Sequence, residues 1–204
     1  MKISQGKRLL ILGAVLVVID QVIKILVKTN MGLGDHFDVI GDWFKIFFIE
    51  NEGMAFGMKF GGAVGKYILT TFRIVLFTAL CWWITSMVRK KSAPTGVLVG
   101  LTLITAGAFG NIIDSLFYGM IFGHYAPFMF GKVVDMFYFP IINTTWPSWF
   151  PFIGGTPFTF FDPVFNFADS CVTVGAFYLI LFQWKFFTTD SSDSEQKNTP
   201  TSEA

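Results

Sequence analysis

Two carboxylates far apart in the chain have the residue type and setting for peptide-bond hydrolysis. Asp135 lies in a strand-like segment, and Asp169 follows Asn166 by three residues at the start of the last apolar run. A carboxyl group at membrane depth costs roughly 2.5–3.5 kcal/mol on insertion scales and usually marks a site. Two carboxyl groups held close together share a proton, which provides an acid and a base for activating water. The alternative is two unrelated interfacial acids, because the sequence does not show close approach.

The residues before Asp169 predict where its helix begins. Asp162 followed by Pro163 is typical of an N-cap and a first helical position. We therefore expect Asn166 and Asp169 to lie on one face in the first turns of a helix.

Two further polar pairs interrupt other apolar runs. Asp20 and Lys24 are four residues apart, so they can pair on one helix face, as structural support rather than as catalytic groups. Asn111 and Asp114 follow Gly110 in a stretch of small residues that allows close helix contact. This second pair could simply hydrogen-bond to neighbouring helices.

The composition is that of a membrane protein. Of 204 residues, 53% are hydrophobic and only 14% are charged, whereas a soluble domain is about one quarter charged. The net charge of +1 gives no basic field for nucleic acid. His36 and His124 lack the spacing of metal ligands and have no partner of the kind that serine or cysteine nucleophiles need, so we expect no metal site.

Four apolar runs are long enough to span a bilayer, at about 9–27, 67–88, 97–118 and 164–187. Basic residues flank the first run on its N-terminal side and the second on its C-terminal side, which predicts that both termini are cytoplasmic. In that topology every polar residue inside the spans lies toward the outer face. We expect one domain over residues 1–187 and a disordered polar cytoplasmic tail over 188–204.

The two outer loops carry the remaining signals. The first contains Lys45–Glu50, which is strand-like, followed by a Gly-rich turn. The second, residues 120–162, is rich in Phe, Trp and Pro and contains the strand-like segment 132–137. Such a loop is too apolar to be a free linker, so we expect it to lie on the bilayer surface or to cover a site.

Five blocks of sequence resemble the lipoprotein signal peptidase (signal peptidase II) family, in the family's order and from Asp20 to Ala176. They are Asp20-Gln21-Val22-Ile23-Lys24, Asn51-Glu52-Gly53-Met54-Ala55-Phe56, Gly110-Asn111-Ile112-Ile113-Asp114, Val133-Val134-Asp135-Met136-Phe137 and Phe165-Asn166-Phe167-Ala168-Asp169.

The resemblance implies a bacterial intramembrane aspartic peptidase with four transmembrane helices and a small extracytoplasmic β-platform. It implies cleavage of diacylglyceryl-modified prolipoproteins directly before the lipidated cysteine, at the periplasmic or outer face of the inner membrane. Asp135 and Asp169 would be the catalytic dyad, without a metal or organic cofactor. The supporting residues would be Asp20, Lys24, Asn51, Asn111, Asp114 and Asn166. We expect a monomer, in contact with membrane lipids, that is a target of the family's cyclic peptide inhibitors.

The sequence departs from the family at two places. Ser115 stands where the family usually has arginine, so Arg73 or Lys24 could compensate as the partner of Asp114. The outer loop is also longer on both sides of Asp135, which leaves its geometry open.

Two rival functions remain at this point. A small proton-coupled transporter would also contain buried acids, but its relay would need polar residues through the inner halves of the helices, which are apolar here. A non-enzymatic membrane scaffold would tolerate conservative changes of its carboxylates.

Overall fold

Long apolar helices make up most of the protein. The computed structural model describes residues 3–52 and 62–188. Within these residues, three helical segments are long and apolar enough to cross a membrane. They are α1 (Gln5–Asn30), α2 (Gly62–Lys90) and the segment Thr95–Ile121, which begins with α3 (Thr95–Ile113). All three agree with the predicted spans and extend a few residues beyond them.

The third segment does not stay α-helical to its end. After α3 comes a π-helical turn, Asp114–Tyr118, and then the short α4, Gly119–Ile121. A π turn inserts one extra residue into the helix and often occurs at functional sites. Here it buries both Asp114 and Ser115 completely.

The last helix is shorter than predicted. The apolar helix α5 covers Phe167–Phe182, inside the expected span of 164–187. The prediction that Asp162 caps this helix is wrong, because Asn166 is its N-cap and Val164–Phe165 form strand β6 instead. Pairing of β6 with a neighbouring strand keeps these residues extended and delays the start of the helix.

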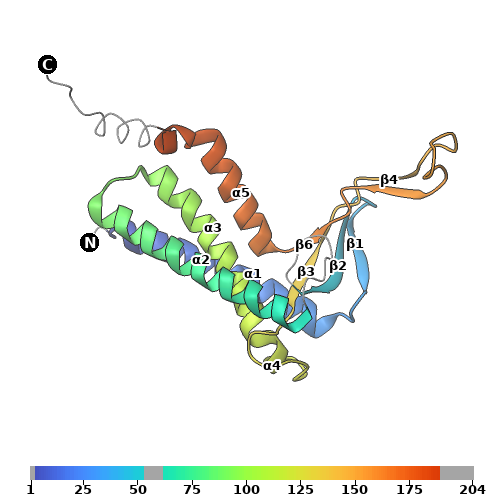
Figure 1. The fold of residues 1–204 in the computed structure, drawn as a ribbon, viewed down its shortest axis with the longest axis horizontal. Coiled ribbons are helices and arrows are strands. Elements are labelled where there is room, and N and C mark those ends of the chain that lie inside the picture. The colour runs from blue at the N-terminus through green and yellow to red at the C-terminus, as the bar shows by residue number, and fades with distance from the viewer. Residues whose placement is uncertain (1–2, 53–61, 189–204) are drawn as a thin grey trace, which may run out of the picture.

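Helix α3 is at the centre of the bundle and packs against α1, α2 and α5 (Figure 1). Glycines permit its close contact with α5, since a Cβ on Gly175 would lie 2.8 Å from the carbonyl oxygen of Gly100. The outward faces of α1, α2 and α5 expose many large apolar side chains. That distribution suits a lipid environment.

A small antiparallel sheet sits at one end of the bundle. It contains β1 (His36–Ile40), β2 (Phe44–Asn51), β3 (Val133–Tyr138) and β6, in the order β1-β2-β3-β6. The strands predicted near residues 45–50 and 132–137 are therefore confirmed. Beneath the sheet, Val134, Met136 and Phe48 form a buried cluster with Val27 and Tyr118, which fixes β3 against the ends of α1 and α3.

The long outer loop contains a second, separate hairpin. Strands β4 (Ile142–Thr145) and β5 (Pro157–Phe160) pair with each other and not with the main sheet. Figure 1 shows this hairpin projecting from the sheet, away from the helices. Of the predicted tail, residues 189–204 lie outside the described residues.

Candidate active site

A buried lysine organises the end of the bundle that carries the sheet. Lys24 of α1 is fully buried and forms ion pairs with Asp114 at 2.8 Å and Asp20 at 3.0 Å. Its third contact is to the amide oxygen of Asn111, at 2.8 Å. The predicted pair of Asp20 and Lys24 is confirmed, and Lys24 also provides the partner of Asp114 that Ser115 cannot. Three buried charges so arranged hold α1 and α3 in one register.

Gln21 extends this cluster, and the sequence reasoning gave it no role. Its amide Nε2 donates to Asp20 at 3.1 Å, to Asp114 at 3.0 Å and to the carbonyl oxygen of Gly110 at 3.2 Å. Its amide oxygen accepts from the hydroxyl of Tyr118 at 3.1 Å. The signal that could have found it is its position in a span directly after Asp20.

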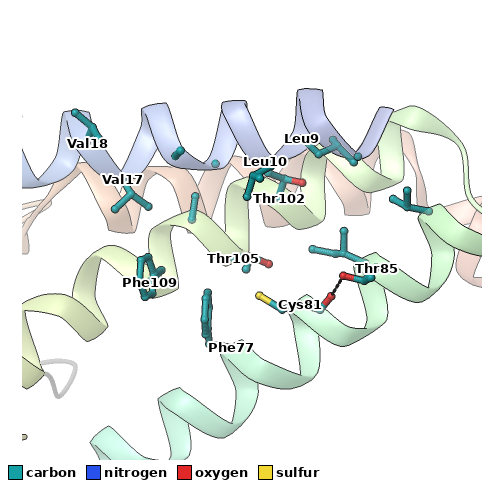
Figure 2. Close-up of a pocket in the computed structure, with 16 residues that line it drawn as sticks. Leu9, Leu10, Val17, Val18, Phe77, Cys81, Thr85, Thr102, Thr105 and Phe109 are labelled. Atoms are coloured by element: carbon teal, nitrogen blue, oxygen red, sulfur yellow. Dashed lines mark hydrogen bonds between the residues drawn. The ribbon is translucent and has the colours of Figure 1, made fainter. Parts of the chain in front are cut away.

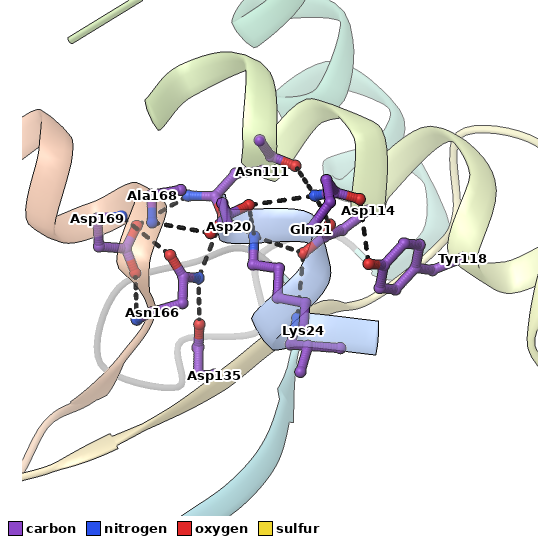
Figure 3. A network of polar contacts seen from close by, with 12 residues as sticks. Asp20, Gln21, Lys24, Asn111, Asp114, Tyr118, Asp135, Asn166, Ala168 and Asp169 are labelled. Carbon is purple, nitrogen blue, oxygen red and sulfur yellow. Dashed lines mark hydrogen bonds and ion pairs between the residues drawn. The ribbon is translucent and has the colours of Figure 1, made fainter. Parts of the chain in front are cut away.

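The carboxylates of Asp20 and Asp114 also bond to the two elements that carry the candidate catalytic acids. Asp20 Oδ1 accepts from the backbone N–H of Ala168, at 2.9 Å, in the first turn of α5. Asp114 Oδ2 accepts from the backbone N–H of Val134, at 3.3 Å, on β3. These two bonds join the charged cluster to the residues directly before Asp169 and Asp135 (Figure 3).

Asp169 is held by the cap of α5. Asn166 Oδ1 accepts from the backbone N–H of Asp169 at 2.9 Å, and Asp169 Oδ2 accepts from the backbone N–H of Asn166 at 3.3 Å, which forms a reciprocal capping box. Asp169 Oδ1 accepts from the amide of Asn111 at 2.8 Å. Both carboxylate oxygens therefore accept hydrogen bonds at the N-terminal end of a helix, and these bonds fix the orientation of the carboxyl group.

Asp135 is held by two asparagines. Its Oδ1 accepts from Asn166 Nδ2 at 2.6 Å, and its Oδ2 accepts from Asn51 Nδ2 at 3.2 Å. Asn166 thus contacts both acids. Its amide nitrogen donates to the carboxyl group of Asp135, and its amide oxygen accepts from the backbone N–H of Asp169. Asp135 and Asp169, which are 34 positions apart along the chain, therefore have Asn166 as a common partner. That the two carboxyl groups share one pocket stays a prediction.

The environment of Asp135 favours its neutral form. The side chain is only 2% exposed, and burial, reinforced by the charge of Asp169, raises the pKa of Asp135 to about 7. Hydrogen bonds from Asn51 and Asn166 oppose the rise but do not cancel it. Asp169 is only half-buried. One acid is therefore poised to hold a proton while the other remains accessible to water.

Arg73 is the second cation of the site. It lies on α2, and its guanidinium interacts electrostatically with Asp169, then with Asp135 and Asp114. Its position on α2 is fixed on both sides. Three residues before it, Thr70 donates to the carbonyl oxygen of Met129 at 3.3 Å, and four residues after it, Phe77 stacks on Phe109 at 4.9 Å.

The structure thus gathers all eight predicted site residues, Asn51 included, into one connected network. Of the predicted block 51–56, residues 53–56 lie outside the described residues. Among residues 3–52 and 62–188, no group of three or more His, Cys, Asp or Glu side chains is arranged to hold a metal ion.

A large apolar cleft lies elsewhere, between α1, α2 and α3 (Figure 2). Its volume is about 680 Å³, and the hydroxyls of Thr85, Thr102 and Thr105 that line it each donate to a carbonyl of their own helix. The cleft therefore presents hydrocarbon and has no acid or base in its lining except the thiol of Cys81. Its contents would be apolar, and the hydrolytic chemistry belongs to the polar network instead.

Comparison with known proteins supports the same interpretation. The family model described as "Signal peptidase (SPase) II" matches residues 12–185. The "Lipoprotein signal peptidase" of Porphyromonas gingivalis (strain ATCC 33277) is 46% identical over 194 residues, covering 88% of this chain and 84% of that protein. The "Lipoprotein signal peptidase" of Amoebophilus asiaticus is 36% identical over 195 residues, covering 88% and 82%.

Two solved structures share the fold. One, titled "Bacterial membrane enzyme structure by the in meso method at 2.3 A resolution", is 26% identical, with a TM-score of 0.60 over 97% of this chain and 94% of that one. A second with the same title at 1.9 Å is 27% identical, with a TM-score of 0.58 over 86% and 91%. The chain is a multi-pass membrane protein with apolar helices and a sheet region, and it belongs to the signal peptidase II family, whose members cleave signal peptides from prolipoproteins.

Proposed function

We propose that this chain is an aspartic endopeptidase that cleaves diacylglyceryl-modified prolipoproteins directly before the lipidated cysteine, with Asp135 and Asp169 as the catalytic dyad. The observation that carries the proposal is the asparagine shared by the two acids, because Asn166 hydrogen-bonds to Asp135 and caps the helix of Asp169. The prolipoprotein substrate itself follows from the family.

In the proposed mechanism a water molecule lies between the two carboxyl groups. Asp169, ionised, takes a proton from this water as its oxygen attacks the scissile carbonyl carbon, and neutral Asp135 donates its proton to the carbonyl oxygen. The tetrahedral intermediate then collapses: the C–N bond breaks, the proton on Asp169 passes to the leaving amine, and Asp135 recovers its own proton. The raised pKa of Asp135, about 7, fits the role of the acid.

The remaining network residues would position the dyad. Asn111 bonds to both Lys24 and Asp169, so it couples the charged cluster to the dyad. Asp20 and Asp114 act through backbone N–H groups of α5 and β3, and Asn51 orients Asp135. Arg73 would provide the positive charge that the family's arginine, replaced here by Ser115, provides elsewhere.

For the topology, we propose four membrane-spanning helices with both termini cytoplasmic and the sheet on the outer side of the inner membrane. The domain would comprise residues 1–187, followed by a polar tail over 188–204. The basic flanks Arg89–Lys91 support this orientation. The substrate's signal helix and acyl chains would then reach the dyad from the outer leaflet. We further propose a monomer that binds the family's cyclic peptide inhibitors.

The decisive experiment compares the wild type with Asp135→Asn and Asp169→Asn on a purified lipid-modified prolipoprotein. Each substitution should abolish cleavage, since each removes one proton-transfer group, while Asp38→Asn on the exposed strand β1 should leave cleavage intact. Cleavage that survives in either dyad variant would remove that residue from the mechanism.

The family assignment does not support the transporter alternative. The positions of the polar groups agree with this, because the carboxylates of the network cluster at the end of the bundle that carries the sheet.

A further inference from the structure

The outer hairpin, residues 141–161, is the largest feature that the proposed mechanism does not use. From Phe139 to Phe161 the sequence has no charged residue, while it has two tryptophans and five phenylalanines besides Phe139. Trp149 is 76% exposed and Phe152 is fully exposed. Exposed aromatic rings without charged neighbours are typical of protein segments at a bilayer interface.

The tip of this hairpin is an ordered structure. Trp146 packs its ring against Phe150 and Phe158, with centroids 5.0 and 4.9 Å away. The backbone of Trp146 bonds to both Thr156 and Gly155, at 2.9 Å each. This packed side of the tip fixes the opposite side, where Trp149 and Phe152 are exposed.

The conformation of Phe152 gives a second, independent indication. Its φ is +69°, in the left-handed region that a bulky side chain adopts at a cost of about 1 kcal/mol or more. This strained backbone holds an aromatic ring entirely outside the protein. A costly conformation that exposes an apolar ring is most simply explained if the ring contacts something else.

The direction of the hairpin identifies the contact. In Figure 1 the hairpin leaves the sheet across the direction in which the helices run, and it remains near the level where α1 ends and α2 begins. It projects on the side of α5, whose outward residues Val174, Phe177 and Ile180 are exposed as lipid-facing residues are. In the proposed topology, on which this inference rests, the outer surface of the bilayer lies beside its tip.

We propose that the outer hairpin is a membrane anchor that inserts Trp149, Phe152 and Ile153 into the interface of the outer leaflet. Its base connects to the elements that carry the dyad. Strand β3, which contains Asp135, precedes the hairpin, and β6, which leads into α5 and Asp169, follows it. Phe139 stacks on Phe165 at 5.7 Å, and Tyr138 donates to Asp162 at 3.1 Å, so the base is fixed to both strands. The anchor thereby sets the depth of the sheet and of Asp135 relative to the bilayer.

Spin labels on the full chain in lipid nanodiscs test the depth of the tip. Cys81 and Cys171, both free thiols, are first replaced by Ser and Ala. Labels are then attached at Phe152→Cys and at two reference positions, Val174→Cys on the lipid-facing side of α5 and Ser92→Cys in the loop after α2. Collisions with oxygen, which concentrates in the bilayer, are compared with collisions with a water-soluble nickel chelate.

The ratio of oxygen to nickel collisions at residue 152 should lie clearly above that at Ser92 and at or below that at Val174, because an interfacial residue is shallower than one about two turns into α5. A ratio equal to that at Ser92 would overturn the proposal in favour of a tip in water. Few collisions with both reagents would overturn it in favour of a protein contact, either with this chain or with a second copy. Because this measurement needs no peptidase activity, its failure is distinct from failure of the proposed function.

A second arm tests the side chains themselves. With the label moved to Thr144→Cys on β4, replacement of Trp149, Phe152 and Ile153 by serine should shift the collision ratio toward that of Ser92. An unchanged ratio would show that these side chains do not set the depth of the hairpin, and would contradict the proposed anchor.

Discussion

Asn166 donates its side-chain amide to Asp135 across the boundary between α5 and β3, at 2.6 Å. The same residue caps α5, so one side chain makes two separable interactions. Its amide oxygen accepts from the backbone of the helix, and its amide nitrogen donates to Asp135. Serine is as good an N-cap as asparagine but has no amide to donate. Substitution at this position can therefore separate stability from activity.

Asn166→Ser should retain thermal stability to within about 1 kcal/mol, because the hydroxyl continues to cap the helix. Its cleavage rate should fall by roughly tenfold or more, because Asp135 loses the amide hydrogen bond that orients its carboxyl group. Asn166→Ala should lose both stability and activity. Thermal unfolding in detergent and cleavage of a prolipoprotein measure the two effects, and a fully active Asn166→Ser enzyme would contradict the orienting role.

The raised pKa of Asp135 predicts how stability depends on pH. The pKa is about 7 in the folded protein, whereas an unfolded aspartate has a pKa of about 3.9. Between these values the folded state binds the extra proton, so stability is lost as the pH rises through this window, and the loss is complete above the folded pKa.

Asp135→Asn removes this titration. Its free energy of unfolding relative to wild type should therefore rise by roughly 2–3 kcal/mol between pH 5 and pH 8, whatever constant offset the new amide adds. Melting curves of both proteins across this pH range measure the difference. Parallel curves would show that Asp135 does not hold a proton in the folded state near neutral pH.

Arg73 should matter through its charge. Arg73→Gln should lower the cleavage rate by roughly tenfold or more, because the positive charge facing Asp169 and Asp135 is lost from a partly desolvated site. Arg73→Lys should retain part of the rate. Arg89→Gln, at the other end of α2, is the matched control and should cleave normally. Wild-type cleavage by Arg73→Gln would exclude the compensating role.

Close packing of α3 on α5 should also determine the position of Asp169 relative to Asp135. A Cβ on Gly107 would collide with the carbonyl oxygen of Ala168 and lie 3.1 Å from the backbone nitrogen of Val172. Gly107→Ala must therefore push α5 away, which should cost about 1–3 kcal/mol and displace Asp169.

Gly13→Ala is the control for the glycine change itself. Its Cβ would meet only the methyl group of Thr102, at an ordinary 3.5 Å. It should be stable or gain up to about 1 kcal/mol, since alanine favours the helix. Equal melting temperatures and equal cleavage for both variants would show that the α3–α5 contact tolerates expansion.

Sequence patterns predicted the spans and the charged pair because each depends on local spacing. Apolar length defines α1, α2 and α3, and the interval of four residues places Asp20 beside Lys24. The resemblance of the five blocks supplied the dyad. What local spacing could not provide was the role of Gln21, whose four partners come from α1, α3 and the π-helical turn.

The start of α5 was also mispredicted because a contact between residues distant in the sequence decides it. Asp162 and Pro163 have the local preference of a helix start, but Val164 and Phe165 pair with β3 and hold the chain extended. A tertiary strand pairing of two residues thus outweighs a local capping signal. The hairpin of β4 and β5 was likewise expected only as an aromatic loop, since its strands pair with each other outside the main sheet.

The pairing of β3 with β6 has a consequence for how this chain tolerates change. Phe137 and Tyr138 lie opposite Phe165 and Val164, so the chain departs from the sheet and returns to it at adjacent points. A segment inserted between these strands therefore begins and ends at adjacent points of the sheet. The spacing of the two aspartates depends on the strand pairing and not on the inserted segment. This insertion site should therefore tolerate replacement of the aromatic segment by a different segment without a change in the geometry of the candidate active site.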